Sequence, residues 1–136
     1  MKSGLKVAIP LLFILVLLLV FQSLFFIGYV PTASMEPTLK EGSFIVAERK
    51  YSELKRGDVI VFRHDGSLMV KRIAAVQGDT VLVRDKPLIV PRNCFYVLGD
   101  NESHSVDSRF WEDPFVGEND IFAKVFLSDG KSRLAS

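Results

Sequence analysis

A continuous apolar stretch dominates the beginning of the chain. Between positions 7 and 33 no side chain is charged, and positions 7–27 are almost entirely Leu, Val, Ile and Phe. A helix of roughly 20 residues is about 30 Å long, which matches the hydrocarbon core of a bilayer. Gly28 and Pro31 then favour the end of a helix. The pattern predicts one transmembrane helix within an anchor region that covers residues 1–30.

A removable signal peptide is the alternative interpretation of this stretch. The basic residues Lys2 and Lys6 at its start fit that reading. Cleavable signals have apolar cores of about 7–15 residues, however, and a cut after Ala33 would place Pro31 and Thr32 where small residues are needed. We therefore interpret the stretch as a retained anchor. Because short basic flanks stay in the cytoplasm, the N-terminus is expected inside and the rest of the chain outside.

After position 42 the pattern changes to short runs rich in β-branched and aromatic residues, separated by turns that contain Gly and Asp. These runs cover positions 43–48, 58–63, 67–76, 80–84, 87–90, 94–98 and 121–127. Runs of this length at such spacing predict an antiparallel β-sandwich or barrel. We predict a mostly β domain over residues 31–128, behind one N-terminal transmembrane helix. A polar C-terminal tail at 129–136 completes the predicted organisation.

Composition and charge narrow the classes of function. A length of 136 residues predicts one domain, and the formal net charge is only +1. No basic patch stands out, which argues against nucleic acid as a partner. Cys94 is the only cysteine, so an intramolecular disulfide is excluded. We interpret Cys94 as a small buried apolar residue.

Ser34 is the first candidate for chemistry. It lies between Pro31 and Pro37, in a segment that we predict to be a stiff, non-helical loop. A serine hydroxyl becomes a nucleophile only when a base takes its proton. The two histidines, His64 and His104, fall in a turn and a polar loop, and both are expected to be exposed. A lysine can serve instead if burial lowers its pKa toward neutrality.

Lys71 is the candidate for that base, because it interrupts an otherwise apolar strand at 68–76. Successive strand side chains point to opposite faces, so Lys71 and Arg72 cannot both be buried in the same layer. If Arg72 is solvated, Lys71 faces the interior with Met69 and Ile73. The alternative is a snorkelling lysine on an edge strand. On the pattern alone that alternative is the more common outcome, since lysines are rarely buried.

A third cluster, at positions 99–109, is dense in small polar residues that can form hydrogen bonds with one another. Asp107 and Arg109 could form an ion pair, and Ser105 could hold a neutral lysine amine in place. Gly, Asp, Asn and Ser also dominate ordinary turns. Taken alone, the cluster is more simply interpreted as a plain polar loop.

Together these segments resemble type I signal peptidases, the bacterial membrane-bound Ser/Lys proteases. Four motifs occur in the family's order and cover most of the chain from 31 to about 124. They are positions 34–39, positions 57–62, positions 71–73 with 78–79, and positions 99–101 followed by Ser105, Asp107, Ser108 and Arg109. One such motif would be weak, but four in order behind an apolar anchor are specific. The segment between 79 and 99 is short, so no large accessory domain is expected.

The resemblance implies a role for each matching residue. Ser34 is the expected nucleophile and Lys71 the expected general base, with the Ser34 N–H and the Thr32 hydroxyl as the oxyanion hole. Ser105 is expected to orient Lys71, while Asp107 and Arg109 brace the site. The expected substrate pocket is shallow and apolar, and it is formed by Val30, Met35, Leu39, Met69 and Val70.

The same resemblance implies a serine endopeptidase that removes signal peptides from secretory preproteins, with small residues at −1 and −3 and an acyl-enzyme intermediate. It implies no metal and no organic cofactor. Preproteins and the lipid bilayer are the expected partners, at a bacterial plasma membrane crossed once. The alternatives are a specialised pilin or plasmid maturation peptidase of the same family and an inactive module that binds signal peptides, against which the intact Ser34, Lys71 and Ser105 argue. A self-cleaving repressor with a Ser/Lys pair is disfavoured by the apolar anchor and by the lack of a recognisable DNA-binding segment.

Overall fold

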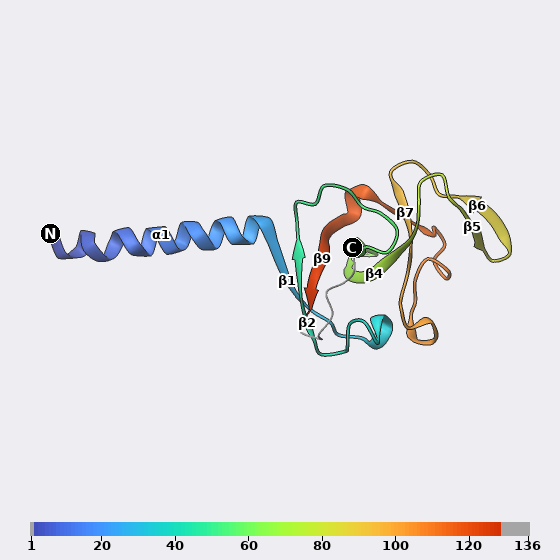
Figure 1. Ribbon diagram of the computed structural model, residues 1–136, viewed down its shortest axis with the longest axis horizontal. Helices are drawn as coiled ribbons and strands as arrows, with labels where there is room; N and C mark the ends of the chain where they lie inside the picture. The colour runs from blue at the N-terminus through green and yellow to red at the C-terminus, as the bar shows by residue number, and fades with distance from the viewer. Residues whose placement is uncertain (1, 129–136) are drawn as a thin grey trace.

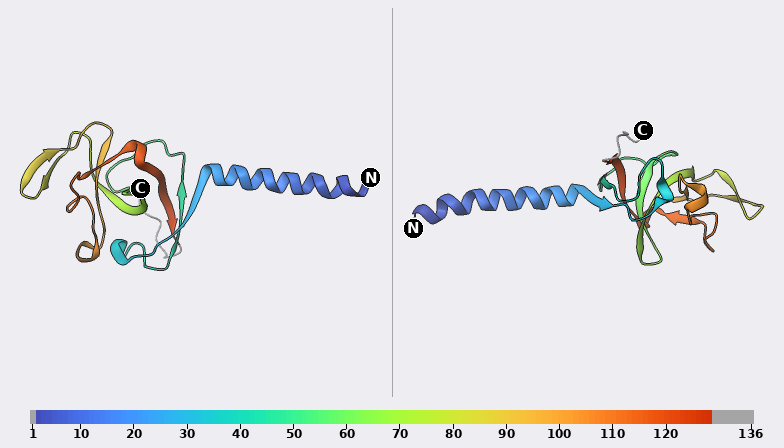
Figure 2. Two further views of the ribbon diagram at one scale, coloured as in Figure 1. Left: turned by 180° about the vertical axis from the view of Figure 1, so that it is seen from behind. Right: turned by 90° about the horizontal axis from the view of Figure 1, so that it is seen from below.

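The computed structural model describes residues 2–128 and shows a β-rich domain at the end of a long helix (Figure 1). The helix α1 (Lys2–Leu24) projects away from the domain, and none of its residues is buried (Figures 1 and 2). By length and composition α1 could cross a membrane. The predicted fold class, mostly antiparallel β with one N-terminal apolar helix, is confirmed. The predicted tail at 129–136 lies outside the described residues.

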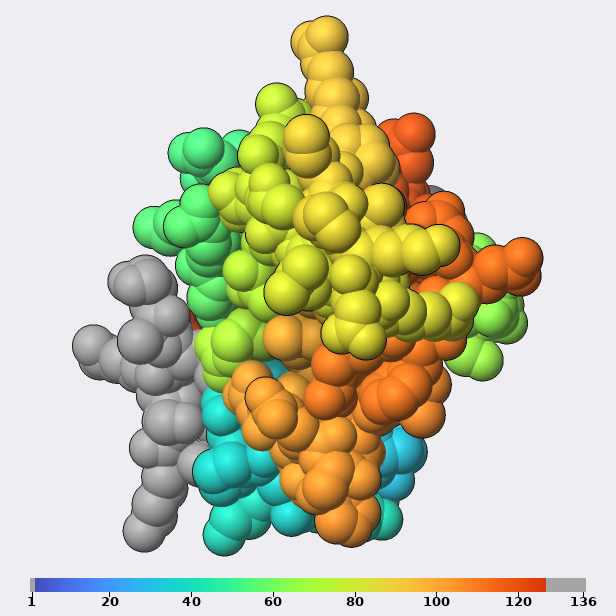
Figure 3. All heavy atoms as spheres, turned by 90° about the vertical axis from the view of Figure 1, so that its right-hand side faces the viewer, coloured from blue at the N-terminus to red at the C-terminus, as the bar shows by residue number. Residues whose placement is uncertain are grey.

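Seven strands form one antiparallel sheet. They are β1 (Phe25–Tyr29), β2 (Phe44–Glu48), β3 (Val59–His64), β4 (Ser67–Val76), β7 (Cys94–Leu98), β8 (Phe115–Gly117) and β9 (Ile121–Ser128). Their order across the sheet is β1-β2-β9-β3-β4-β7-β8. The strands β5 (Thr80–Val83) and β6 (Lys86–Ile89) form a separate hairpin, which projects from the side opposite α1 (Figures 1 and 3). Short 3₁₀ turns lie at η1 (Ala33–Met35), η2 (Glu102–His104) and η3 (Glu118–Asp120).

Strand β3 lies in the middle of the sheet and is buried on both faces. Because side chains alternate along a strand, its four consecutive apolar residues divide between two parts of the core. Val59 and Val61 pack with Met35, Leu39, Ile45 and neighbouring apolar side chains. Ile60 and Phe62 pack on the other face with Ile73, Val97, Trp111 and others. Lys71 lies opposite Ile60 in the β3–β4 pairing, which places the candidate base beside this doubly buried strand.

The anchor helix is shorter than predicted, because it ends at Leu24 rather than near Gly28. The next five residues leave the helix and pair with β2 as the edge strand β1. Gly28 lies opposite Ile45 in that pairing, and an added Cβ there would come within 2.7 Å of the Phe26 ring. Gly28 therefore lies inside β1 and does not end the helix, and a larger side chain there would crowd Phe26 and Ile45.

Two further expectations differ from the structure. His64 is not simply exposed, because its ring stacks on Trp111 with 3.9 Å between centroids and its side chain is 25% exposed. His104 is exposed, as predicted. Cys94 is only partly buried, where it packs beside Tyr96, and this burial raises the pKa of its thiol.

Candidate active site

Ser34 lies in η1, which is one turn of 3₁₀ helix formed by Ala33–Met35. The prediction of a non-helical loop is therefore wrong for these three residues. The residues on either side, Thr32 and Glu36, are extended, as expected for Glu36 before a proline. The turn packs Met35 into the core, where its side chain is 1% exposed. Ser34 itself is 7% exposed. The short turn therefore presents the Ser34 hydroxyl at a fixed place on the edge of the core.

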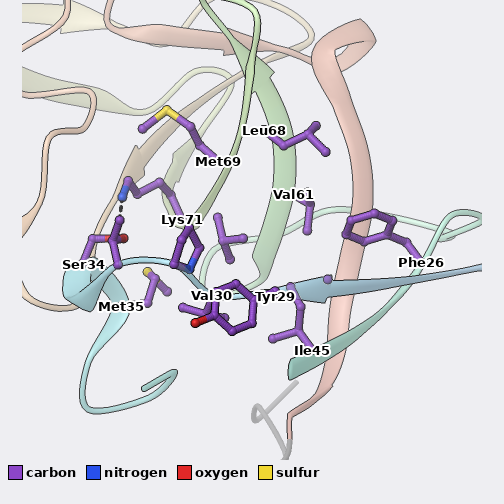
Figure 4. Close-up of a pocket in the computed structure, with 14 residues that line it drawn as sticks. Phe26, Tyr29, Val30, Ser34, Met35, Ile45, Val61, Leu68, Met69 and Lys71 are labelled. Carbon is purple, nitrogen blue, oxygen red and sulfur yellow. Dashed lines mark hydrogen bonds between the residues drawn. The ribbon is translucent and has the colours of Figure 1, made fainter. Parts of the chain in front are cut away.

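Lys71 extends from β4 toward that hydroxyl, and its Nζ lies 2.8 Å from Ser34 Oγ (Figure 4). The lysine is 3% exposed, while Arg72 points to the other face and pairs with Asp100. The inward orientation predicted from strand alternation is thus confirmed, and the snorkelling alternative is excluded. Burial lowers the pKa of Lys71, and the negative charge of Asp107 opposes this shift. Lowering the pKa of an amine increases the fraction that is neutral and has a lone pair able to accept the serine proton.

The Thr32 hydroxyl also reaches the serine, and it donates a hydrogen bond of 3.2 Å to Ser34 Oγ. Thr32 and Lys71 therefore contact the same oxygen atom from different elements. The predicted grouping of Thr32, Ser34 and Lys71 is present in the structure as a geometric cluster. Their catalytic roles remain predictions.

Asp107 is fully buried, and its carboxylate holds other residues of the 99–109 loop together. It accepts hydrogen bonds from Ser105 Oγ at 2.8 Å, from the Gly99 N–H at 2.9 Å and from Arg109 Nε at 2.8 Å. Burial alone would raise the pKa of this carboxyl, but these donors outweigh it and hold the pKa below its usual value. The predicted Asp107–Arg109 pair is therefore observed. The Ser105 hydroxyl proton is donated to Asp107, and the hydrogen bonds of the described residues include none between Ser105 and Lys71.

Gly99 and Asp100 were noted in the sequence only as parts of a motif, without a role. An added Cβ at Gly99 would overlap Ser105 Oγ and lie 2.5 Å from Ser105 Cβ and 2.7 Å from the Ser34 carbonyl oxygen. Asp100 accepts two hydrogen bonds of 2.8 Å from Arg72, the neighbour of the candidate base. The 99–109 loop packs directly against η1, which we call the serine turn, because the Asn101 N–H donates a hydrogen bond to the Ser34 oxygen. The orange and cyan surfaces to which these two segments belong adjoin in Figure 3.

An apolar cavity of about 210 Å³ opens beside the serine and the lysine (Figure 4). Four of the predicted pocket residues line it: Val30, Met35, Met69 and Val70. The fifth, Leu39, is fully buried in the core with Met35 and is not among the lining residues. The sequence reasoning missed lining side chains from β1, β2, β3 and the start of β4, namely Phe26, Tyr29, Ile45, Val61 and Leu68. Alternation shows which residues of one strand share a face, but only the strand pairing shows which faces meet around the cavity.

Comparison with known proteins agrees with this arrangement. The family described as signal peptidase, peptidase S26, matches residues 4–91 and 87–128, which is nearly the whole chain. The chain belongs to the signal peptidase family. The resemblance inferred from the four motifs is therefore confirmed at family level.

Individual relatives of this signal peptidase family member differ in length and in name. A probable signal peptidase I-2 of Synechocystis sp. is 27% identical over 73% of this chain and 60% of its own length. A signal peptidase I of Leptolyngbya laminosa is 30% identical over 61% of this chain and 59% of its own length. The chain thus spans about 60% of the length of these two relatives.

A third relative, from Staphylococcus aureus, is 25% identical over 93% of this chain and 92% of its own length. Its name is inactive signal peptidase IA. Membership of the family therefore does not by itself establish catalysis. For this chain, catalysis has to be inferred from the geometry of the site.

Proposed function

We propose that the chain is an active type I signal peptidase, a serine endopeptidase that removes signal peptides from secretory preproteins. The observation that carries the proposal is the 2.8 Å contact between Lys71 Nζ and Ser34 Oγ. Both side chains are nearly inaccessible, and burial lowers the pKa of Lys71. A buried amine beside a serine hydroxyl is the arrangement that a Ser/Lys dyad requires.

In the first half of the reaction, neutral Lys71 accepts the Ser34 proton as Ser34 Oγ bonds to the scissile carbonyl carbon. The carbonyl electron pair moves to oxygen, and the Ser34 N–H and the Thr32 hydroxyl stabilise that oxyanion. Thr32 Oγ1 donates to Ser34 Oγ in the free site, so its proton must turn toward the substrate oxygen. Collapse of the intermediate breaks the C–N bond, and the leaving amine takes the proton from the Lys71 ammonium.

In the second half, Lys71 accepts a proton from water while the water oxygen adds to the acyl carbon. Collapse of this second intermediate releases the signal peptide and returns the proton to Ser34. The ammonium form of Lys71 occurs twice in the proposed reaction, once in each half. The negative charge of Asp107 favours that form, whereas burial favours the neutral amine that begins each half. We infer that Ser105 acts on Lys71 through Asp107, since its hydroxyl helps to hold the carboxylate whose charge favours the ammonium form.

The substrate fits as an added strand. Strand β4 pairs with β7 only from Arg72 onward, so the segment 68–70 extends beyond its partner on that side. An extended peptide can add to such an edge and place alternate side chains into the cavity. The cavity is mostly apolar, which suits apolar side chains, and membership of the signal peptidase family implies that those at −1 and −3 are small, such as alanine.

The position relative to a bilayer follows from α1, which we propose to be the membrane anchor. Lys2 and Lys6 flank its start, so the N-terminus is assigned to the cytoplasm and the β domain to the opposite face of a bacterial plasma membrane. Strand β1 follows α1 directly, and Ser34 comes only ten residues after Leu24. The site therefore stays close to the membrane surface, where the end of another protein's signal segment emerges.

A second candidate function is an anchored module that binds signal peptides without cutting them. The Staphylococcus aureus relatives carry the name inactive signal peptidase IA, which favours the absence of cleavage in this alternative. A specialised maturation peptidase would use the same site as a general one, and complementation of cells depleted of their main signal peptidase distinguishes these two.

Cleavage of a preprotein by the purified full chain in detergent tests activity against mere binding. We expect a single cut after the signal segment when alanine occupies −1 and −3. Replacing the −1 alanine of the substrate by phenylalanine should lower kcat/KM by about 100-fold, because membership of the signal peptidase family implies a small side chain at this position. The products are identified by mass spectrometry. Retention of the preprotein without any product would instead support the binding module.

A further inference from the structure

The oxyanion-hole donor assigned above is a backbone group, and its direction is set by the peptide plane to which it belongs. The Ser34 N–H shares that plane with the carbonyl oxygen of Ala33. In a trans peptide the N–H and C=O point in opposite directions. Whatever holds the Ala33 oxygen therefore determines where the Ser34 N–H is aimed.

Asn101, which follows directly after the Gly99–Asp100 pair, holds that oxygen. Its Nδ2 donates a hydrogen bond of 3.0 Å to the Ala33 oxygen, and its backbone N–H donates one of 2.9 Å to the Ser34 oxygen. The peptide planes before and after the serine are therefore both bonded to one residue, 68 positions away from Ala33 in the chain. Within the serine turn, the Glu36 N–H also bonds the Ala33 oxygen, at a longer 3.2 Å.

The side chain of Asn101 is itself oriented by neighbours. Ser103 Oγ donates to Asn101 Oδ1 at 3.3 Å, which leaves the amide nitrogen facing Ala33. The His104 N–H donates to the Asn101 carbonyl oxygen at 3.0 Å. The preceding residue, Asp100, is fixed by two hydrogen bonds from Arg72. The amide therefore projects from a braced loop to the Ala33 oxygen, beside the hydrogen bond from the Asn101 backbone N–H to the Ser34 oxygen.

We propose that Asn101 is a positioning residue for the oxyanion hole, acting through the Ala33 carbonyl to aim and polarise the Ser34 N–H. This inference rests on the proposed peptidase function. Donation to a carbonyl strengthens the N–H of the same peptide group as a donor. A charged oxyanion is the species that gains most from both effects. Asn101 is therefore expected to stabilise the tetrahedral intermediate while contributing little to binding of the uncleaved substrate.

The test compares Asn101→Asp, which keeps the shape but replaces the donor nitrogen by an acceptor oxygen, with Asn101→Ala. Glu102→Gln is the matched control, since it makes a change of the same size at an exposed position of the same loop. We expect kcat to fall by about 10–100-fold in both Asn101 variants, with KM within about 2-fold of wild type. The control should retain wild-type kinetics. Thermal unfolding checks that each variant is folded.

A peptide aldehyde provides the readout that a purely structural role would not move. It forms a hemiacetal with the serine, and its oxygen occupies the position of the oxyanion. We expect its Ki to rise in proportion to the loss of kcat/KM, while the pH at which activity appears stays unchanged. An unaltered Ki, or a loss confined to KM, would overturn the proposal. Wild-type protein without cleavage activity would overturn the peptidase assignment as well, whereas wild-type activity with unaffected Asn101 variants overturns this inference alone.

Discussion

Replacing Lys71 by methionine is expected to reduce preprotein cleavage by at least about 1,000-fold. Methionine keeps much of the apolar stem and removes the amine that lies 2.8 Å from the Ser34 hydroxyl, so the proposed acceptor of the serine proton is lost. Ser34→Ala should give a loss of the same order, and the double variant should be no worse than either single one, because the two groups act as a unit. Single-turnover cleavage in detergent measures these losses.

The same variant is expected to be at least as stable as wild type. The pKa of Lys71 is lowered in the folded chain, so at neutral pH the unfolded chain binds a proton more readily at this position. That difference disfavours folding at neutral pH, and it fades as the pH rises from the lowered pKa toward the ordinary lysine value. Removing the amine removes the difference, so the unfolding temperature should not fall. Retained cleavage by Lys71→Met, or unfolding as the cause of its loss, would contradict the account.

Gly99→Ala has the second largest expected effect, a loss of about 100-fold or more in kcat/KM. The added methyl group would overlap Ser105 Oγ and approach the Ser34 carbonyl oxygen at 2.7 Å, so the loop or the serine turn has to move. A displacement of about 1 Å is enough for a loss of this size. Overpacking should also lower the free energy of unfolding by about 1–3 kcal/mol.

Gly117→Ala is the matched control for this variant. Gly117 has an ordinary φ of −73°, and an added Cβ there would meet its nearest atom, Asp120 Oδ2, at 3.7 Å. The substitution is chemically the same but should leave cleavage at the wild-type level. Steady-state kinetics and thermal unfolding of both variants separate steric damage at the site from a general effect of the substitution. Wild-type kinetics in Gly99→Ala would show that the loop does not position the serine.

The sequence allowed prediction of the strands whose pattern is local. The strand at 58–63 and the position of Lys71 within an apolar strand can be recognised from the sequence, because the alternation of side chains along a strand depends only on neighbouring residues. Strand β1 was missed because its apolar residues continue the anchor without a break, and only pairing with β2 separates the two. Strand β8 was missed because three residues are too short for any periodicity.

The site could be predicted only in part. Lys71 and Ser34 are 37 positions apart, so their contact depends on how η1 packs against β4 and not on spacing. The four motifs supplied that pairing through resemblance. Leu39 shows the limit of the resemblance, since the structure places it in the core rather than in the cavity lining. The role of Asn101 depends on two hydrogen bonds to the serine turn, and no sequence pattern encodes these.

The pH dependence of kcat/KM for preprotein cleavage tests the central claim most directly. Below the folded-state pKa of Lys71 the amine is protonated and has no lone pair for the serine proton, so activity should be lost as the pH falls through that value. Because burial lowers this pKa, we expect a rising limb controlled by one group that titrates below the ordinary lysine value of 10.5. A limb that appears only at the ordinary lysine value, or a rate independent of pH, would contradict the assignment of Lys71 as the general base.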